Sequence, residues 1–157
     1  MAKFSPITIL IALQIVAAVT SQITDATLAS ASKIAVQQLN AFRKLNNVPL
    51  IADNAAIYTQ CLNHSKYMAS TGILTHNGFS NRISSLGFRV GTAAENVAYF
   101  SKIVTTADQI ATQFITQWKN SAGHRANMLN KYVNLASVGI ARNGSKYYAT
   151  MILVQKI

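Results

Sequence analysis

The sequence predicts a single α+β domain, and two observations carry that prediction. Apolar residues recur at helical spacing in the stretch before residue 73, whereas two β-prone runs, 136–142 and 146–155, flank Asn143-Gly144 near the end of the chain. An Asn-Gly pair between such runs is a strong hairpin signal. Helices that precede a sheet, with further helices between its strands, are typical of α+β folds.

The N-terminal residues predict an export signal. Lys3 supplies a positive charge, Ile7–Val19 is almost entirely apolar, and the small residues that end this stretch suit signal peptidase. The alternative is a retained membrane anchor, which is the weaker interpretation because a membrane span needs about 20 apolar residues. We therefore expect a signal peptide over 1–21, a short flexible lead over 22–30 and one domain over 31–157.

Two helices are predicted next. The first begins near Ser30 or Ser32 and ends before Pro49, because the residue before a proline avoids the helical region of backbone space. Asp53 is expected to cap the second helix, and Gly72 is suited to end it. One face of the first helix is expected to be apolar and to pack into the core: Ala35, Leu39, Phe42 and Leu45.

The middle of the chain predicts loop and strand over 80–100, followed by two more helices. Residues 106–109 have a capping-box pattern ahead of an apolar stripe that ends at Trp118, which we assign to the core. Ser121 is placed to cap a short helix over 122–129.

Cysteine and charge content restrict the class of protein. Cys61 is the only cysteine, so the chain cannot form an intramolecular disulfide and packing alone must stabilise it. We interpret Cys61 as a buried apolar residue rather than a reactive thiol. The net charge of +10 favours contact with anionic surfaces such as membranes or wall polymers. The basic residues are scattered and are not interleaved with aromatic residues, so no nucleic-acid partner is expected.

Three polar segments interrupt the apolar sequence: 75–82, 94–98 and 118–127. They hold two of the three histidines, His76 and His124, and one of only four acidic residues, Glu95. A carboxylate in an apolar run needs hydrogen-bond donors or a cation as its partner. The two histidines are the first candidates for that partner.

A histidine, then Glu-Asn, then Trp-x-x-Ser-x-Gly-His-Arg-x-Asn, in this order, resembles the CAP (SCP, PR-1-like) superfamily, specifically its cysteine-poor branch common in bacteria. The resemblance extends from about residue 33 to the C-terminus. It implies a secreted protein with a three-layer α-β-α sandwich and a cleft lined by two histidines and two acidic residues. His76, Glu95 and His124 match three of these four, and Ser121 stands in place of the second acidic residue.

The matched residues allow two interpretations of the site. Two imidazoles and one carboxylate are a common zinc donor set, so His76, His124 and Glu95 could bind Zn²⁺ with water in the fourth position, although no cofactor is required. Alternatively, Glu95 accepts hydrogen bonds from loop amides and the histidines and holds three segments together. Arg82 and Arg125 either recognise an anionic group or hold Glu95 and the helix ends, and we favour the second role for at least one of them. Further residues expected to line the same cleft are Ser121, Asn77, Asn96, Arg82 and Arg125.

The resemblance supports secretion and fold more than it supports any ligand. We expect a monomeric, extracellular protein of the binding, effector or defence type, whose ligand is a lipid, a sterol, a cell-wall component or another protein; a binding role is favoured over an enzymatic one. The alternative is a metal-dependent extracellular hydrolase, either a peptidase or an esterase. A third class, a membrane-active antimicrobial protein, rests only on the positive charge. We expect no integral membrane span after processing, and the sequence contains no serine nucleophile elbow, Walker loop or His-Glu-x-x-His helix.

Overall fold

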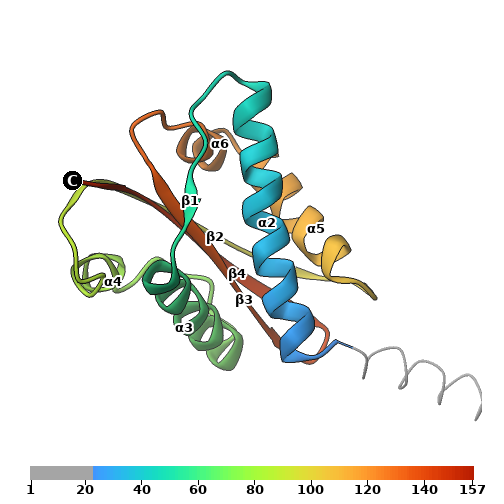
Figure 1. The fold of residues 1–157 in the computed structure, drawn as a ribbon. Coiled ribbons are helices and arrows are strands. Elements are labelled where there is room, and N and C mark those ends of the chain that lie inside the picture. Colours follow the sequence, from blue (N-terminus) through green and yellow to red (C-terminus); the bar gives the residue numbers. More distant parts are fainter. Residues whose placement is uncertain (1–22) are drawn as a thin grey trace, which may run out of the picture.

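The computed structural model describes residues 23–157, so the expected signal peptide lies outside the described residues. Figure 1 shows the order of the helices and strands along the chain. None of the helices in this part of the chain is long and apolar enough to cross a membrane. The elements are α2 (Asp25–Leu45), β1 (Ala52–Asp53), α3 (Ala55–Thr71), α4 (Phe79–Ser84), β2 (Val90–Ser101), α5 (Ala107–Asn120), α6 (Ala122–Met128), β3 (Leu135–Asn143) and β4 (Lys146–Lys156).

Four strands form one sheet in the order β1-β3-β4-β2. The three long strands pair antiparallel, and the short strand β1 runs parallel to β3. Helices α3 and α4 lie on one face of the sheet, and α2, α5 and α6 lie on the other (Figure 1). This is the expected three-layer α-β-α sandwich.

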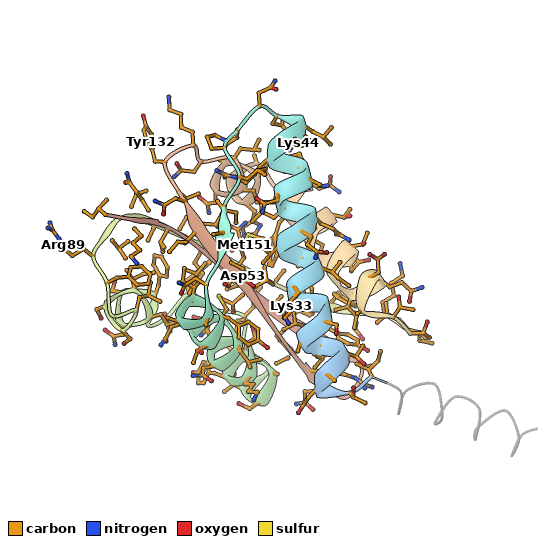
Figure 2. The ribbon with its side chains drawn as sticks, viewed as in Figure 1. Lys33, Lys44, Asp53, Arg89, Tyr132 and Met151 are labelled. Carbon is orange, nitrogen blue, oxygen red and sulfur yellow. The ribbon has the colours of Figure 1, made fainter. Side chains whose placement is uncertain are left out.

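The central strand β4 is buried on both faces, because its side chains alternate between the two helical layers. Met151 and Leu153 pack with the core that α2 and α5 cover, whereas Ile152 and Val154 pack with Ile57 of α3. Met151 accordingly lies at the centre of the molecule in Figure 2. The sheet thus divides the core into two parts.

Helix α2 begins earlier than the sequence pattern predicts. Thr24 and Thr27 form a capping box, in which each side-chain oxygen accepts a hydrogen bond from the backbone N–H of the other residue. Leu28 is buried, so the first turns of the helix also pack against the core. The predicted start and the flexible lead are therefore wrong for residues 25–30, which are helical.

Arg43 holds the C-terminal end of α2. Leu45, which the helical stripe predicts to be buried, is 81% exposed, whereas the Arg43 side chain is fully buried. Its guanidinium donates to the carbonyl oxygens of Pro49, at 2.7 Å, and of Met128 and Asn130, at 2.7 and 3.0 Å. Burial lowers the pKa of this guanidinium, and the carbonyl oxygens compensate its charge. Arg43 thus joins α2 to the loop that follows α6.

Helix α3 is capped by Asn54 instead of Asp53. The Asn54 side chain accepts hydrogen bonds from two backbone N–H groups of the first turn, and Asp53 belongs to β1. Gly72 ends the helix with a φ of 72°, as predicted. The stretch predicted as loop and strand also contains the short helix α4, whose capping residue, Gly78, has no side chain that could form a capping bond.

The predictions for α5, α6 and the C-terminal hairpin are confirmed. Thr106 and Gln109 form the expected capping box, and Trp118 is fully buried. Ser121 occupies the N-cap position of α6, although its side chain makes no capping hydrogen bond. The hairpin between β3 and β4 turns at Gly144, whose φ of 58° suits glycine.

Cys61 is fully buried where α3 meets the sheet. Its thiol donates to the carbonyl oxygen of Ser137 at 3.3 Å, and burial raises the pKa of the thiol well above its usual range. A buried thiol of this kind is unreactive, in agreement with its interpretation as an apolar core residue.

Helix α3 approaches β3 closely at Gly139. A Cβ atom placed on Gly139 would lie 2.1 Å from the backbone nitrogen of Leu62 and 2.3 Å from the carbonyl carbon of Cys61. Both of these atoms belong to the helix backbone, so the whole helix would have to shift. Glycine at this position therefore determines how closely α3 packs on the sheet.

Gly139→Ala is expected to destabilise the protein by about 3 kcal/mol or more, because the added methyl group overlaps helix backbone. Gly123→Ala is the matched control, since a Cβ there meets nothing within 4 Å and alanine favours the helical conformation of α6. Urea denaturation of both variants measures the difference. Equal stability of the two variants would contradict the prediction.

Candidate functional site

Glu95 lies on β2 with its side chain only 2% exposed, and Arg82 of α4 holds it. The Arg82 Nε atom donates to Glu95 Oε2 at 2.9 Å, and Nη2 donates to Oε1 at 2.8 Å. Such paired, charge-assisted bonds are among the strongest hydrogen bonds in proteins. His76 Nδ1 donates to the same Oε1 atom at 2.9 Å. Protein donors therefore occupy both carboxylate oxygens.

Arg82 uses all of its N–H groups inside the protein. Besides its two bonds to Glu95, its Nη1 atom donates to His64 Nδ1 at 3.1 Å and to the Asn77 carbonyl oxygen at 2.8 Å. Its Nη2 atom also donates to the His76 carbonyl oxygen at 3.3 Å. A guanidinium has five N–H donors, so Arg82 keeps none for an external anion. Arg82 therefore holds Glu95 and does not recognise an anionic ligand.

His64 is a buried part of the site that the sequence motifs do not include. Arginine only donates, so His64 Nδ1 accepts from Arg82, and the ring proton resides on Nε2, which donates to the Thr75 carbonyl oxygen at 2.7 Å. Burial lowers the pKa of His64, and the charge of Arg82 acts in the same direction. The ring is therefore neutral and fixed. Its helical spacing from the buried Cys61 and Met68 is the sequence signal that indicates this position.

Asn96, the next residue of β2, organises the opposite side of the strand, because successive side chains point to opposite faces. It is fully buried. Its Nδ2 atom donates to the His124 carbonyl oxygen at 3.1 Å, and its Oδ1 atom accepts from Asn127 Nδ2 at 2.8 Å. Glu95 and Asn96 together attach α4 and α6 to the same edge strand.

His76 contacts this edge strand through its side chain, and His124 contacts it through its backbone carbonyl oxygen. The His76 side chain is 56% exposed, and His124 is partly buried. The pKa of His124 is lowered, first by burial and second by the charge of His76 when that residue is protonated. Such a charge effect operates between near neighbours. The structure thus brings His76, Glu95 and His124 to one edge of the sheet.

The remaining candidate residues have structural or solvent-facing positions. Arg125 donates to the carbonyl oxygen of Lys119 at 2.9 Å and so holds the end of α5. Ser121 is partly exposed between α5 and α6, and Asn77 is exposed in the segment that precedes α4. Arg125 therefore supports the fold through this bond but is itself exposed, and Ser121 and Asn77 are also accessible to a ligand.

The three-ligand zinc set does not match this geometry. Within residues 23–157, no group of three or more His, Cys, Asp and Glu side chains is arranged to hold a metal ion. Arg82 and His76 already donate to both oxygens of Glu95, so the protein itself engages this carboxylate. It thereby orients His76. Two imidazoles, those of His76 and His124, remain as candidate metal donors.

Several known structures have the same fold. An extracellular protein with an SCP domain from Bacillus anthracis matches with a TM-score of 0.67 at 22% identity, over 85% of this chain and 44% of its own. An outer surface protein from Borrelia burgdorferi matches with a TM-score of 0.66 at 14% identity, over 80% of this chain and 92% of its own. NaASP2, in a structure with Zn²⁺, matches with a TM-score of 0.57 at 10% identity, over 83% of this chain and 80% of its own. The chain thus spans less than half of the Bacillus protein, and these identities establish likeness of fold alone.

No curated protein shows a significant sequence match to the chain. The model of the cysteine-rich secretory protein family, by contrast, matches residues 36–157, a range that contains every residue of the site described above. Three observations indicate the same family: the order of the motifs, the three-layer sandwich and this match. The chain therefore belongs to the CAP family.

Proposed function

We propose that this CAP domain is secreted and acts by binding an extracellular ligand rather than by catalysis. The observation that carries the proposal is that Arg82 and His76 donate to both oxygens of the Glu95 carboxylate. Hydrolysis by a metal ion held at the histidine pair needs a further positioned group that is free to act as general base. Similar domains in an extracellular Bacillus protein and a Borrelia outer surface protein support action outside the cell.

The other acidic residues do not replace Glu95. Asp53 accepts hydrogen bonds beside β3, Asp108 accepts one from α2, and Asp25 lies in the first turn of α2. The chain has only four acidic residues, so these three and Glu95 are the whole set. A metal-dependent peptidase or esterase would therefore lack a carboxylate base at the histidine pair. The ligand we propose is a lipid, a sterol, a wall component or a protein.

The first test compares binding with turnover. We expect the mature protein to be retained by sterol-containing vesicles, by anionic vesicles or by isolated cell walls. We expect it to hydrolyse neither fluorogenic peptides nor p-nitrophenyl esters, with or without added zinc. The control is the double variant His76→Ala/His124→Ala. Turnover by the wild type that this double variant lacks would establish a hydrolase and overturn the proposal.

A specific observation also favours zinc binding by the histidine pair. Both Glu95 oxygens accept hydrogen bonds, so His76 Nδ1 carries a proton, and in the neutral ring Nε2 keeps its lone pair. A carboxylate that orients a histidine in this way is common behind metal ligands. We propose that His76 and His124 supply two zinc ligands, while Glu95 orients His76. The NaASP2 structure with Zn²⁺ supports this second proposal.

Zinc binding is expected to require both histidines and neutral pH. Calorimetry at neutral pH should detect binding to the wild type and none to His76→Ala or His124→Ala. Because the pKa of His124 is lowered from its ordinary value of 6.5, this ligand is neutral above that pH, and zinc affinity should fall as acid protonates it at lower pH. Asn77→Ala, one residue from His76, is the matched control. Unchanged zinc affinity in both histidine variants would exclude this pair as the zinc site.

Glu95→Gln is expected to lower the free energy of unfolding by about 3 kcal/mol, because it leaves the buried Arg82 without its counter-charge. The loss should be the same in chelator and in excess zinc, since Glu95 orients a ligand without binding metal. Asp25→Asn removes an exposed carboxylate at a helix terminus and should cost only about 0.5 kcal/mol. Denaturation curves of both variants provide the comparison. A Glu95→Gln variant as stable as the wild type in chelator would contradict the structural role proposed for Glu95.

A further inference from the structure

A second candidate site lies beside the histidine pair, between α3 and the segment that leads into α4. It is a groove of about 410 Å³. Its walls come from two parts of the chain that are separated by Gly72, the end of α3. The residues that the argument uses are Gln60, Asn63, His64, Tyr67, Asn77 and Arg82.

One wall of the groove is a single face of α3. Gln60, Asn63, His64 and Tyr67 follow the spacing that places helical residues on one side. The Tyr67 ring lies nearly parallel to the His64 ring, with 14° between the planes and 6.1 Å between the centroids. Tyr67 is 50% exposed, whereas His64 is buried and fixed by hydrogen bonds at both ring nitrogens. The groove therefore presents an aromatic ring to solvent over a rigid support.

Three amide side chains line the same groove as this ring. Over the part of the chain that the structure describes, the side-chain amides of Gln60, Asn63 and Asn77 have no hydrogen-bond partner in the protein. Each amide can both donate and accept. The groove thus combines three free amides with one exposed aromatic ring.

The groove offers no free charge to a ligand. All five N–H groups of Arg82 are used inside the protein, and its charge is balanced by Glu95. His64 is neutral, because Arg82 donates to its Nδ1 atom and burial lowers its pKa. An anionic or cationic ligand would therefore lose its hydration at this groove without gaining an opposite charge. A neutral ligand with many hydrogen-bonding groups fits these conditions.

We propose that this groove binds a neutral pyranose sugar. Neighbouring hydroxyl groups of a pyranose donate and accept hydrogen bonds, which matches the amides of Gln60, Asn63 and Asn77. The apolar C–H face of the sugar packs on the exposed ring of Tyr67. The inference goes beyond the proposed function and does not rest on metal binding, because neither His76 nor His124 takes part. The sugar belongs either to a wall polymer or to a glycoprotein.

The test is a titration of ¹⁵N-labelled protein followed by NMR. The two probes are a β-1,4-linked N-acetylglucosamine trimer, which represents wall polymers, and an α-linked mannose trimer, which represents glycoproteins. We expect saturable shifts of the backbone amides of residues 60–67 and Asn77 with one of the trimers. The trimer that produces them identifies the source of the sugar.

Variants separate a sugar site from non-specific contact. Tyr67→Ala should weaken the affinity about tenfold, through loss of the ring that packs on the sugar. Tyr132→Ala is the matched control, because Tyr132 is 60% exposed and lies at the end of the molecule away from α3 (Figure 2). It should bind like the wild type. An unchanged spectrum elsewhere in Tyr67→Ala confirms that this variant is folded.

Three results would overturn the proposal. The first is the absence of saturable shifts with both trimers. The second is equal affinity of the Tyr67→Ala variant and the wild type. The third is tighter binding of an anionic galacturonate trimer than of either neutral trimer, because it would show that charge governs recognition at this groove.

Discussion

The buried pair of Arg82 and Glu95 is the interaction on which the rest of the site depends. Burying two charges costs several kcal/mol each unless their hydrogen-bonding groups find partners, and here all five N–H groups of Arg82 and both oxygens of Glu95 do so. The partners belong to α3, to the segment before α4 and to β2. They meet only when these elements have assembled. The site and this half of the fold therefore form together.

Short-range signals predict most of the fold, and long-range contacts explain the exceptions. The capping box of Thr106, the end of α3 at Gly72 and the hairpin at Gly144 each depend on residues a few positions apart. Arg43 is an exception that depends on a long-range contact. Its burial requires the carbonyl oxygen of Met128, which lies 85 positions further along the chain. Helix α4 has only six residues, too few to show a helical period, and its glycine cap gives no side-chain signal.

Most residues of the site can be predicted from the sequence, but the way they interact cannot. The order of the motifs identifies His76, Glu95 and His124, and the structure places them at one strand edge. The role of Glu95 depends on where the N–H groups of Arg82 point. In the structure they point at the Glu95 carboxylate, and the spacing of the two residues along the chain does not reveal this. His64 cannot be identified as a site residue from the sequence, because its helical spacing from Cys61 and Met68 indicates burial alone. Only its contact with Arg82 makes it part of the site.

Glu95 and Asn96 are consecutive residues with separate tasks, and this affects how β2 finds its place beside β4. A shift of β2 by one residue would turn each side chain to the other face of the sheet. The carboxylate of Glu95 would then point toward α6, and the amide of Asn96 would replace it beside the buried guanidinium of Arg82. A slipped register of β2 would therefore be unfavourable on both faces of the sheet, because the buried charge of Arg82 would lose its partner and Asn96 would lose its contacts with α6. The residues that build the site therefore also favour the correct register of β2 on β4 during folding.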